Sequence, residues 1–333
     1  MADKALITGV AGQDGTYLAE FLLARGYEVH GTDKDAARLA KAEEILTKGS
    51  GSGKLSLHLV DSANFPELSD IVRSTRPDEV YNLAADTSVE LSFLDPLASA
   101  HSVAVGAANL IQAVSLNQPE ARIFQASTAE MFGDSPGPQN EDTALAPLSP
   151  YACAKVYAHH LATMHRNYYD MYICSGIMFN HESPRRDTRF VSRKVTSGIA
   201  RVLSGDLDAI SLGNLSARRD WGHARDYVEA MWTMLQQEAP VDYVIATGTS
   251  HSVTEFLEIA FGLVGLEWRR HVVEDPDLRR PSDPADLQGD STRARTQLGW
   301  KPTVGLVELI REMLQHDLTA LNLDSIIRGE VFS

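Results

Sequence analysis

Short apolar runs alternate with longer amphipathic segments along the first half of the chain. The runs have the length of buried strands, while the segments between them carry apolar residues at helical spacing. The runs are residues 5–8, 27–31, 55–60, 79–84 and 122–127, and the amphipathic segments include residues 17–26, 64–75 and 95–117. Alternating strands and helices are typical of a parallel sheet that is covered on both faces. We therefore predict an α/β fold with a doubly wound parallel sheet.

This alternation fades in the second half of the chain, where loops containing Arg and Pro become frequent. We therefore expect two domains. Residues 1–179 would form the larger one, joined by a return segment at about 223–255 in which residues 243–248 rejoin the sheet. Residues 180–222 and 256–333 would form a smaller domain.

Composition narrows the class of protein. The 333 residues are 44% hydrophobic, which allows sizeable cores, and the formal net charge of -15 disfavours nucleic acid or an anionic membrane as a partner. We identify neither a signal peptide nor an apolar run long enough to span a membrane. The two cysteines, Cys153 and Cys174, lack the paired spacing of a zinc site. We expect a cytoplasmic globular enzyme without a metal.

The first chemical motif is TGVAGQDG, residues 8–15, which follows a predicted strand and opens a helix. Gly9 would permit the tight turn, Gly12 would let the backbone approach a pyrophosphate, and Gly15 would allow close packing. The helix N-terminus adds oriented N–H groups and a partial positive charge. The motif predicts dinucleotide binding in a Rossmann-type domain.

Two aspartates follow the next predicted strands. Asp33 could accept hydrogen bonds from the adenosine ribose hydroxyls, and its charge would repel a 2′-phosphate. Asp61 would reach the adenine. The alternative interpretations are a solvent-exposed loop aspartate at position 33 and an ordinary cap at position 61.

The second chemical motif is YACAK, in which Tyr151 and Lys155 share one face of a helix introduced by Pro150. A lysine ammonium beside a phenol stabilises the phenolate and moves the pKa of the tyrosine toward a range useful for proton transfer. Such a pair is suited to removing a hydroxyl proton while a hydride leaves carbon. An exposed tyrosine over a lysine stem is the alternative interpretation.

A basic stretch interrupts the acidic chain at residues 185–194, and further arginines follow at positions 218, 219, 279 and 280. Guanidinium groups bind phosphate oxygens in charge-assisted pairs, so this cluster suits a nucleotide diphosphate. A solvated charged surface is the alternative.

Together these motifs carry a family resemblance. TGxxGxxG followed by YxxxK resembles the extended short-chain dehydrogenase/reductase superfamily, and longer segments resemble its GDP-mannose 4,6-dehydratase family along nearly the whole chain. The segments are ALITGVAGQDGTYLAEFLL, QASTAEMFG, SPYACAKVYAHH, GIMFNHESPRR, FVSRKVT, LGNLSARRDWGHARDYVEAMWTMLQQ and LGWKP. The resemblance implies an NAD(P)-dependent lyase whose substrate is a nucleotide-diphosphate sugar, GDP-mannose first.

The resemblance implies roles for four residues. Tyr151 would remove the proton of the sugar 4-hydroxyl while C4 gives a hydride to the nicotinamide, and Lys155 would hold the cofactor ribose. Glu130 would remove the C5 proton of the 4-keto sugar, and water would leave C6 with help from Glu130 or Thr128. Hydride return to C6 regenerates the cofactor. We expect Thr128 and Glu130, two positions apart, on one face of a strand.

The resemblance also implies two sets of binding residues. At the cofactor, besides Gly9, Gly12, Gly15, Asp33, Asp61, Tyr151 and Lys155, they are Gln13, Asp14, Ser62, Leu83, Ala84, Ala85, Thr87, His181 and Arg186. At the nucleotide sugar they are Thr87, Asn180, Lys194, Arg219 and Arg280.

Several positions depart from the family pattern. Asp33, Lys34 and Asp35 stand where the family usually has an arginine pair that holds the NADP phosphate and helps a tetramer form. We therefore expect NAD and a homodimer, with NADP and a tetramer as the alternatives. The other departures, Asp86, Ala129, Asp187 and Thr188, leave the nucleotide base and the sugar open.

Two other functions stay open from the sequence. A reductase or an epimerase of the same superfamily could carry a glutamate at position 130, but a reductase would consume NAD(P)H and an epimerase would keep the 6-hydroxyl. A non-catalytic nucleotide-binding protein is the other alternative, which the intact Glu130, Tyr151 and Lys155 disfavour.

Overall fold

The computed structural model describes residues 3–49, 52–323 and 326–327. Its centre is a seven-stranded sheet with the order β10-β6-β5-β4-β1-β2-β3, in which every pairing is parallel. The strands are β1 (Lys4–Thr8), β2 (Glu28–Asp33), β3 (Lys54–Leu59), β4 (Glu79–Asn82), β5 (Arg122–Thr128), β6 (Ile173–Met178) and β10 (Tyr243–Ile245). The predicted doubly wound parallel sheet is confirmed.

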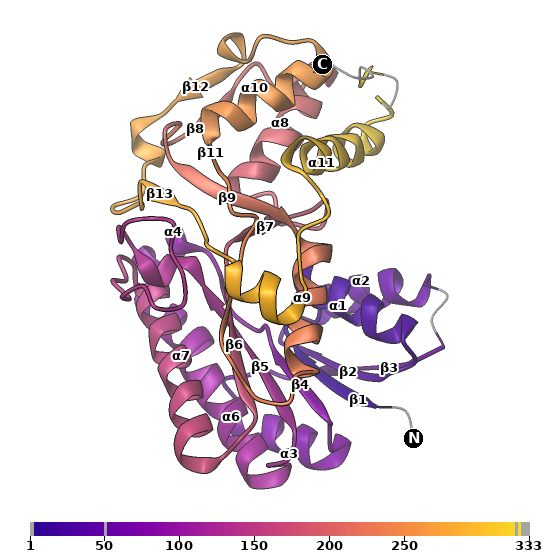
Figure 1. Ribbon diagram of the computed structural model, residues 1–333. Coiled ribbons are helices and arrows are strands. Elements are labelled where there is room, and N and C mark those ends of the chain that lie inside the picture. The colour runs from indigo at the N-terminus through magenta and orange to yellow at the C-terminus, as the bar shows by residue number, and fades with distance from the viewer. Residues whose placement is uncertain (1–2, 50–51, 324–325, 328–333) are drawn as a thin grey trace.

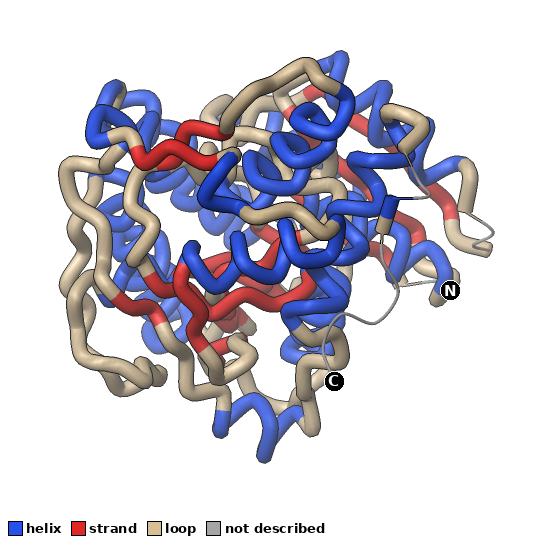
Figure 2. Tube along the Cα trace, turned by 90° about the horizontal axis from the view of Figure 1, so that it is seen from above, coloured by secondary structure: helices blue, strands red, loops and turns tan. Residues whose placement is uncertain are grey.

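Helices cover both faces of this sheet (Figures 1 and 2). One face packs against α1 (Gln13–Ala24), α2 (Ala36–Thr47) and α9 (Ala224–Leu235), and the other against α3 (Phe65–Thr75), α6 (Gly106–Asn117) and α7 (Pro150–Tyr169). Alternating strand residues explain the two cores, because Ile7 packs on the α1 side and Leu6 on the α3 side.

A second hydrophobic core lies beyond the carboxyl ends of the sheet strands, in the upper part of Figure 1. It is built from α8 (Val191–Ser204), α10 (Val253–Val264) and α11 (Leu306–Ala320). Two small sheets lie beside these helices, one of β7 (Asn180–Glu182), β9 (Arg218–His223), β11 (Ser250–Ser252) and β13 (Asp286–Leu287), the other of β8 (Ile210–Leu212) and β12 (Val272–Glu274). Short 3₁₀ turns at Trp268–Arg270 and Pro276–Leu278 complete this half, whereas the π-helical turn at Ala294–Leu298 packs against the core of the large sheet.

The expected domain boundaries remain a prediction, but the packing bears on one of them. Strand β10 and helix α9 rejoin the large sheet within the proposed return segment. A boundary at residue 255 would cut α10, whose buried side chains belong to the second core. We therefore propose that the return segment ends before Val253.

A long helical run precedes β5. It begins after α4 (Val89–Leu94) with α5 (Pro96–Ala100), passes through a π-helical turn at His101–Val105, and continues as α6. By length and composition alone, the run Pro96–Asn117 is apolar enough to cross a membrane, so the expectation that no such run exists was wrong. Its α6 part packs instead against the sheet, with Leu110, Ile111 and Val114 fully buried.

Candidate active site

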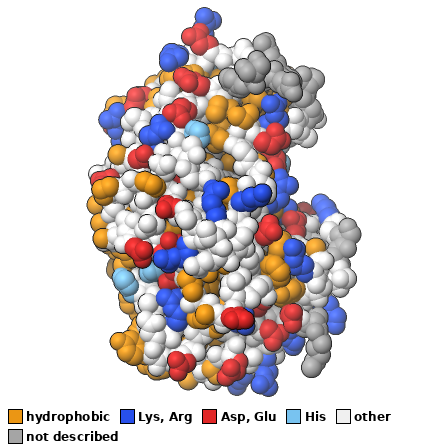
Figure 3. Space-filling view, viewed as in Figure 1, with side chains coloured by type: hydrophobic (Ala, Val, Ile, Leu, Met, Phe, Trp, Pro, Cys, Tyr) orange, Lys and Arg blue, Asp and Glu red, His pale blue; other side chains and the backbone are white. Residues whose placement is uncertain are grey.

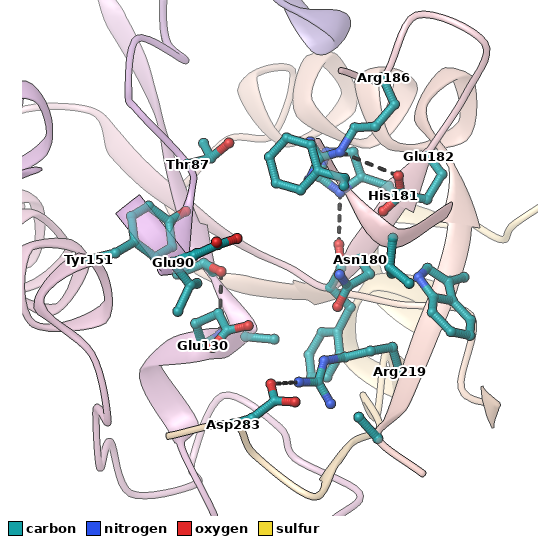
Figure 4. Close-up of a pocket in the computed structure, with 18 of the residues that line it drawn as sticks. Thr87, Glu90, Glu130, Tyr151, Asn180, His181, Glu182, Arg186, Arg219 and Asp283 are labelled. Carbon is teal, nitrogen blue, oxygen red and sulfur yellow. Dashed lines mark hydrogen bonds and ion pairs between the residues drawn. The ribbon is translucent and has the colours of Figure 1, made fainter. Parts of the chain in front are cut away.

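A cavity lies between the carboxyl ends of the large-sheet strands and the small sheet of β7 and β9. Figure 4 shows Tyr151, Glu130 and Thr87 on one side of it and Asn180, His181 and Arg219 on the other. The predicted residues that line it are Asp14, Leu83, Thr87, Thr128, Glu130, Tyr151, Lys155, Asn180, His181, Arg186, Lys194, Arg219 and Arg280. The predicted residues outside this lining are Gly9, Gly12, Gln13, Gly15, Asp33, Asp61, Ser62, Ala84 and Ala85.

The glycine motif forms the turn between β1 and α1. Gly9 has φ +72°, and a Cβ there would come within 2.8 Å of Ala84 Cα. A Cβ on Gly15 would come within 2.4 Å of Gly9 O, so this position has no room for a side chain. Gly12 is the N-cap of α1 and leaves its first turn without a side-chain cap. This loop and helix end therefore fit the pyrophosphate of a dinucleotide.

Asp33, at the end of β2, and Arg38, on α2, place one anion and one cation near that loop. Asp33 is buried, and its carboxylate accepts a hydrogen bond from the Asp35 N–H at 3.1 Å. Asp35 in turn caps α2 by accepting from the N–H groups of Ala37 and Arg38. The Arg38 guanidinium lies 3.9 Å from the place that a Cβ on Gly12 would take. Arg38 was not among the residues predicted from the sequence.

The other predicted cofactor residues continue along the same edge of the sheet. Asp61 is exposed and accepts from the Ala63 N–H at 2.9 Å in a turn, while Asn64 rather than Asp61 caps the helix that follows. The Ala84 N–H donates to Thr8 Oγ1, which joins the segment after β4 to the end of β1. Residues 83–85 therefore follow β4 beside the glycine turn.

Helix α7 brings Tyr151 and Lys155 to the end of β5. Ser149 caps the helix by accepting from the Ala152 N–H, and Pro150 occupies its first turn. Lys155 is buried, donates to Ala126 O at 2.8 Å, and lies with Nζ 5.8 Å from the centre of the Tyr151 ring. The arrangement holds both side chains at the cavity.

The pKa of Tyr151 in this pair differs from the one expected from the sequence. Burial and then the charge of Glu130 raise the pKa of Tyr151, while the Thr128 hydroxyl works in the opposite direction. Burial lowers the pKa of Lys155 to about 8. The expected lowering of the tyrosine pKa by Lys155 is therefore not seen, because the ammonium faces a carbonyl oxygen rather than the phenol.

Glu130 follows β5 on a short 3₁₀ turn, Ala129–Phe132, so the expected strand position is wrong. Thr128 is the last residue of β5, and its hydroxyl accepts from the Glu130 N–H at 3.3 Å. The turn aims both side chains into the cavity even though they do not alternate along a strand. The Glu130 carboxylate lies 4.0 Å from the Arg280 guanidinium.

An ion pair ties α1 to the small sheet across the cofactor side of the cavity. His181 donates from Nδ1 to Phe179 O at 2.7 Å, and its Nε2 lies 2.8 Å from Asp14 Oδ2. Burial alone would lower the pKa of His181, but the charge and hydrogen bonds of its partners raise it overall. The Gln13 side chain bonds His181 O and Ser183, so any contact of Gln13 with a cofactor falls to its backbone.

The predicted basic residues gather on the side of the cavity that faces the second core. Arg186 stacks on Phe190 and pairs with Glu182, whereas the Lys194 ammonium has no ion pair or hydrogen bond within the described residues. Arg219 is buried and donates to Asp283 at 2.6 Å. Sequence reasoning missed Asp283, because no spacing indicates that the loop after Arg280 returns to β9.

Two of the residues that depart from the family pattern also lie near the cavity. Arg189 pairs with Asp187 at 3.0 Å and approaches Asp86 at 3.8 Å, which brings the loop after β4 close to the loop after β7. Glu90 and Trp221 line the cavity as well, but no motif in the sequence pointed to either as a site residue.

Comparisons with known proteins agree with this geometry. The profile of the family GDP-mannose 4,6 dehydratase matches residues 6–313. The chain is 46% identical over 322 residues to GDP-mannose 4,6 dehydratase 1 of Arabidopsis thaliana, covering 94% of this chain and 89% of that protein. It is 42% identical over 340 residues to GDP-mannose 4,6 dehydratase of Homo sapiens, covering 94% and 91%.

A solved structure shows the same fold. UDP-glucose 4-epimerase from Thermus thermophilus, in complex with NAD, superposes with a TM-score of 0.81 and 26% identity over 94% of this chain and 98% of that one. The match along most of the sequence, together with the glycine turn and the Tyr151 and Lys155 pair, establishes the family. The chain belongs to the GDP-mannose 4,6-dehydratase family, a group of nicotinamide-dependent lyases.

Proposed function

We propose that this chain converts GDP-mannose into GDP-4-keto-6-deoxymannose. The observation that carries the proposal is one cavity lined by Tyr151, Thr128 and Glu130 and also by Arg219 and Arg280. A base for a hydroxyl proton and a base for a carbon acid thus lie opposite guanidinium groups suited to a diphosphate.

The first step is oxidation at C4. Tyr151 takes the proton of the 4-hydroxyl, and the Thr128 hydroxyl supports the phenolate that this requires. A bound nicotinamide would supply the hydride acceptor for C4 and the hydride donor for C6. Lys155, with its pKa lowered to about 8 by burial, holds the ribose and adds positive charge while it is protonated.

The second step is the loss of water. The ketone at C4 makes the C5 proton acidic, and the Glu130 carboxylate removes it. The same carboxyl group or Thr128 then gives a proton to the departing 6-hydroxyl. Thr128 ends β5 and Glu130 lies on the turn that follows, so two neighbouring positions of the backbone serve adjacent carbon atoms of the sugar.

We propose NAD as the preferred cofactor. Asp33 is buried at the end of β2, where its charge opposes a 2′-phosphate. Arg38 is the residue that favours NADP, because its positively charged guanidinium lies beside the glycine turn. The ratio of dissociation constants for NAD and NADP, measured by titration of the purified protein, tests this choice.

We also propose that two chains associate. Adjoining helices α4, α5 and α7 expose large apolar side chains, among them Leu94 (77%), Leu97 (74%) and Tyr157 (51%). Contiguous exposed apolar side chains of this size mark interaction surfaces in soluble proteins. A twofold dimer would bury this face against itself.

The mass of the product tests the proposed reaction. Purified protein is incubated with GDP-mannose and NAD without a reductant, and the experiment is repeated with NADP and with other nucleotide hexoses. We expect GDP-mannose to lose one water. An isomer of unchanged mass would indicate an epimerase, a requirement for NAD(P)H a reductase, and binding without turnover a non-catalytic protein.

A further inference from the structure

The loop that contains Asp283 places a carboxylate where the proposed substrate has its diphosphate. Asp283 Oδ1 lies 2.6 Å from one guanidinium nitrogen of Arg219 and 3.4 Å from one of Arg280. The same Arg280 nitrogen lies 4.0 Å from Glu130 Oε1. Figure 4 shows Asp283 directed at Arg219 from the edge of the cavity. Two cations and two anions therefore alternate from β9 to the catalytic turn.

Arg219 does not depend on Asp283 for its position. Its second guanidinium nitrogen donates to Arg218 O at 2.7 Å and to Pro284 O at 2.8 Å. These carbonyls, one in β9 and one in the loop next to Asp283, hold the guanidinium without the Asp283 carboxylate, whose contribution is charge. Arg280 has no comparable anchor among the contacts of the described residues, since its ion pairs are those with Asp283 and Glu130.

Another cation that lines the same cavity is not neutralised by a protein carboxylate. Lys194 reaches the cavity from α8, and the structure records for its ammonium no partner among the described residues. An anion that enters therefore meets Lys194 and also arginines that protein carboxylates already hold, among them Arg219 and Arg280. A single phosphate can use Lys194 alone, whereas a diphosphate is long enough to reach an arginine as well.

We propose that Asp283 is a specificity-determining residue that stands in for a substrate phosphate between Arg219 and Arg280. This inference rests on the proposed function of the cavity. A ligand has to displace the Asp283 carboxylate before it can bind both guanidinium groups. A diphosphate replaces that carboxylate with two charged groups, so it regains the attraction to both guanidinium groups. A monophosphate regains less of this attraction. Asp283 therefore disfavours nucleotides with one phosphate.

Displacement of Asp283 also changes the surroundings of Glu130. In the arrangement described, Arg280 is shared between Asp283 and Glu130. When a diphosphate takes the guanidinium, Glu130 loses part of the attraction that holds its carboxylate toward Arg280. The carboxylate is then free to approach the sugar, which links the correct diphosphate to the second step of the reaction.

The test compares Asp283→Asn with Asp286→Asn. The second variant removes the same charge three residues further on, at the start of β13, where the Asp286 carboxylate lies 4.0 Å from Arg218 and has no recorded contact with Arg219 or Arg280. GDP and GMP are titrated calorimetrically into full-length protein saturated with NAD, at low and high salt. For Asp283→Asn we expect GDP to bind roughly three- to tenfold more tightly and GMP to gain more, so the preference for GDP contracts. Asp286→Asn should leave that preference unchanged.

The outcomes separate this inference from the proposed function. Weaker GDP binding by Asp283→Asn, or an unchanged preference for GDP over GMP, would show that Asp283 only supports the arginines and would overturn the inference. Equal gains in both variants would assign the effect to net charge and overturn it too. If the unaltered protein bound neither nucleotide, the proposed function itself would be wrong, and the inference with it.

Discussion

Glu130 lies close to three groups of the candidate active site: Thr128, Arg280 and Tyr151. Its backbone N–H bonds the Thr128 hydroxyl, its carboxylate faces Arg280, and its charge adds to burial in raising the pKa of Tyr151. A charged Glu130 therefore opposes the ionisation of Tyr151. This suits a reaction in which Tyr151 acts first, at the 4-hydroxyl, and Glu130 acts second, at C5.

Replacing Glu130 with Gln tests that order of events. We expect Glu130→Gln to lower the rate of water loss by roughly 10²- to 10⁴-fold, the usual contribution of a general base, because an amide cannot take the C5 proton. The rate is followed by product mass, and exchange of the C5 proton with deuterated solvent should fall in parallel. Binding of NAD should be unchanged, which serves as the folding control. Undiminished water loss would contradict the role of Glu130.

Site residues that are close in the sequence could be predicted, whereas those that only the fold brings together could not. Tyr151 and Lys155 are four positions apart on one helix, so the sequence alone indicates that they share a face. Asp283 contacts Arg219 only because the chain after Arg280 comes back to β9, and no local pattern encodes that return. Glu130 lies between these cases, since its place was predicted but its 3₁₀ turn was not.

At the scale of elements, contacts join α1 to β7 and to the loop that follows it on the cofactor side of the cavity. Two ion pairs connect them, Asp14 with His181 and Glu20 with Arg185. Only the first contains a group that titrates near neutral pH. Both nitrogens of His181 face oxygen acceptors, so the geometry favours the imidazolium.

The Asp14 pair should make stability depend on pH. The pKa of His181 is raised above its ordinary value of 6.5, so its contribution is fully present below that value and is lost as the pH rises through the raised pKa. The pKa of Asp14 is lowered, so its contribution is present above 3.8 and is lost only in acid. Asp14→Asn should therefore cost about 2 kcal/mol near pH 6 and less above pH 8.

Urea unfolding at several pH values checks this expectation, with Glu20→Gln as the control. The Glu20 pair joins the same two segments without a histidine, so its loss should cost the same at pH 6 and pH 8.5. A cost of Asp14→Asn that stays constant over this range would show that His181 is neutral in the folded protein.

At the scale of the whole molecule, periodicity explains why one half was easier to predict. The strands of the large sheet are apolar runs separated by helices, and their order follows from right-handed crossovers. Strands β7, β11 and β13 have only two or three residues, too few to show a period. These short strands form because they pair with β9, and this pairing arises only when the chain folds. On the face drawn in Figure 3, acidic and basic side chains are interspersed.

The exposed helix face leads to the last prediction, which concerns assembly. Leu97 is 74% exposed on α5, next to α4 and α7, which expose Leu94 and Tyr157. Burying a leucine is worth about 1.5–3 kcal/mol, and a twofold interface counts each change twice. We expect the protein to be a dimer by light scattering and Leu97→Glu to shift it toward the monomer. Val273→Glu, at an exposed residue on β12, should leave the dimer intact. A monomeric parent, or a dimer indifferent to both changes, would place the interface elsewhere or exclude it.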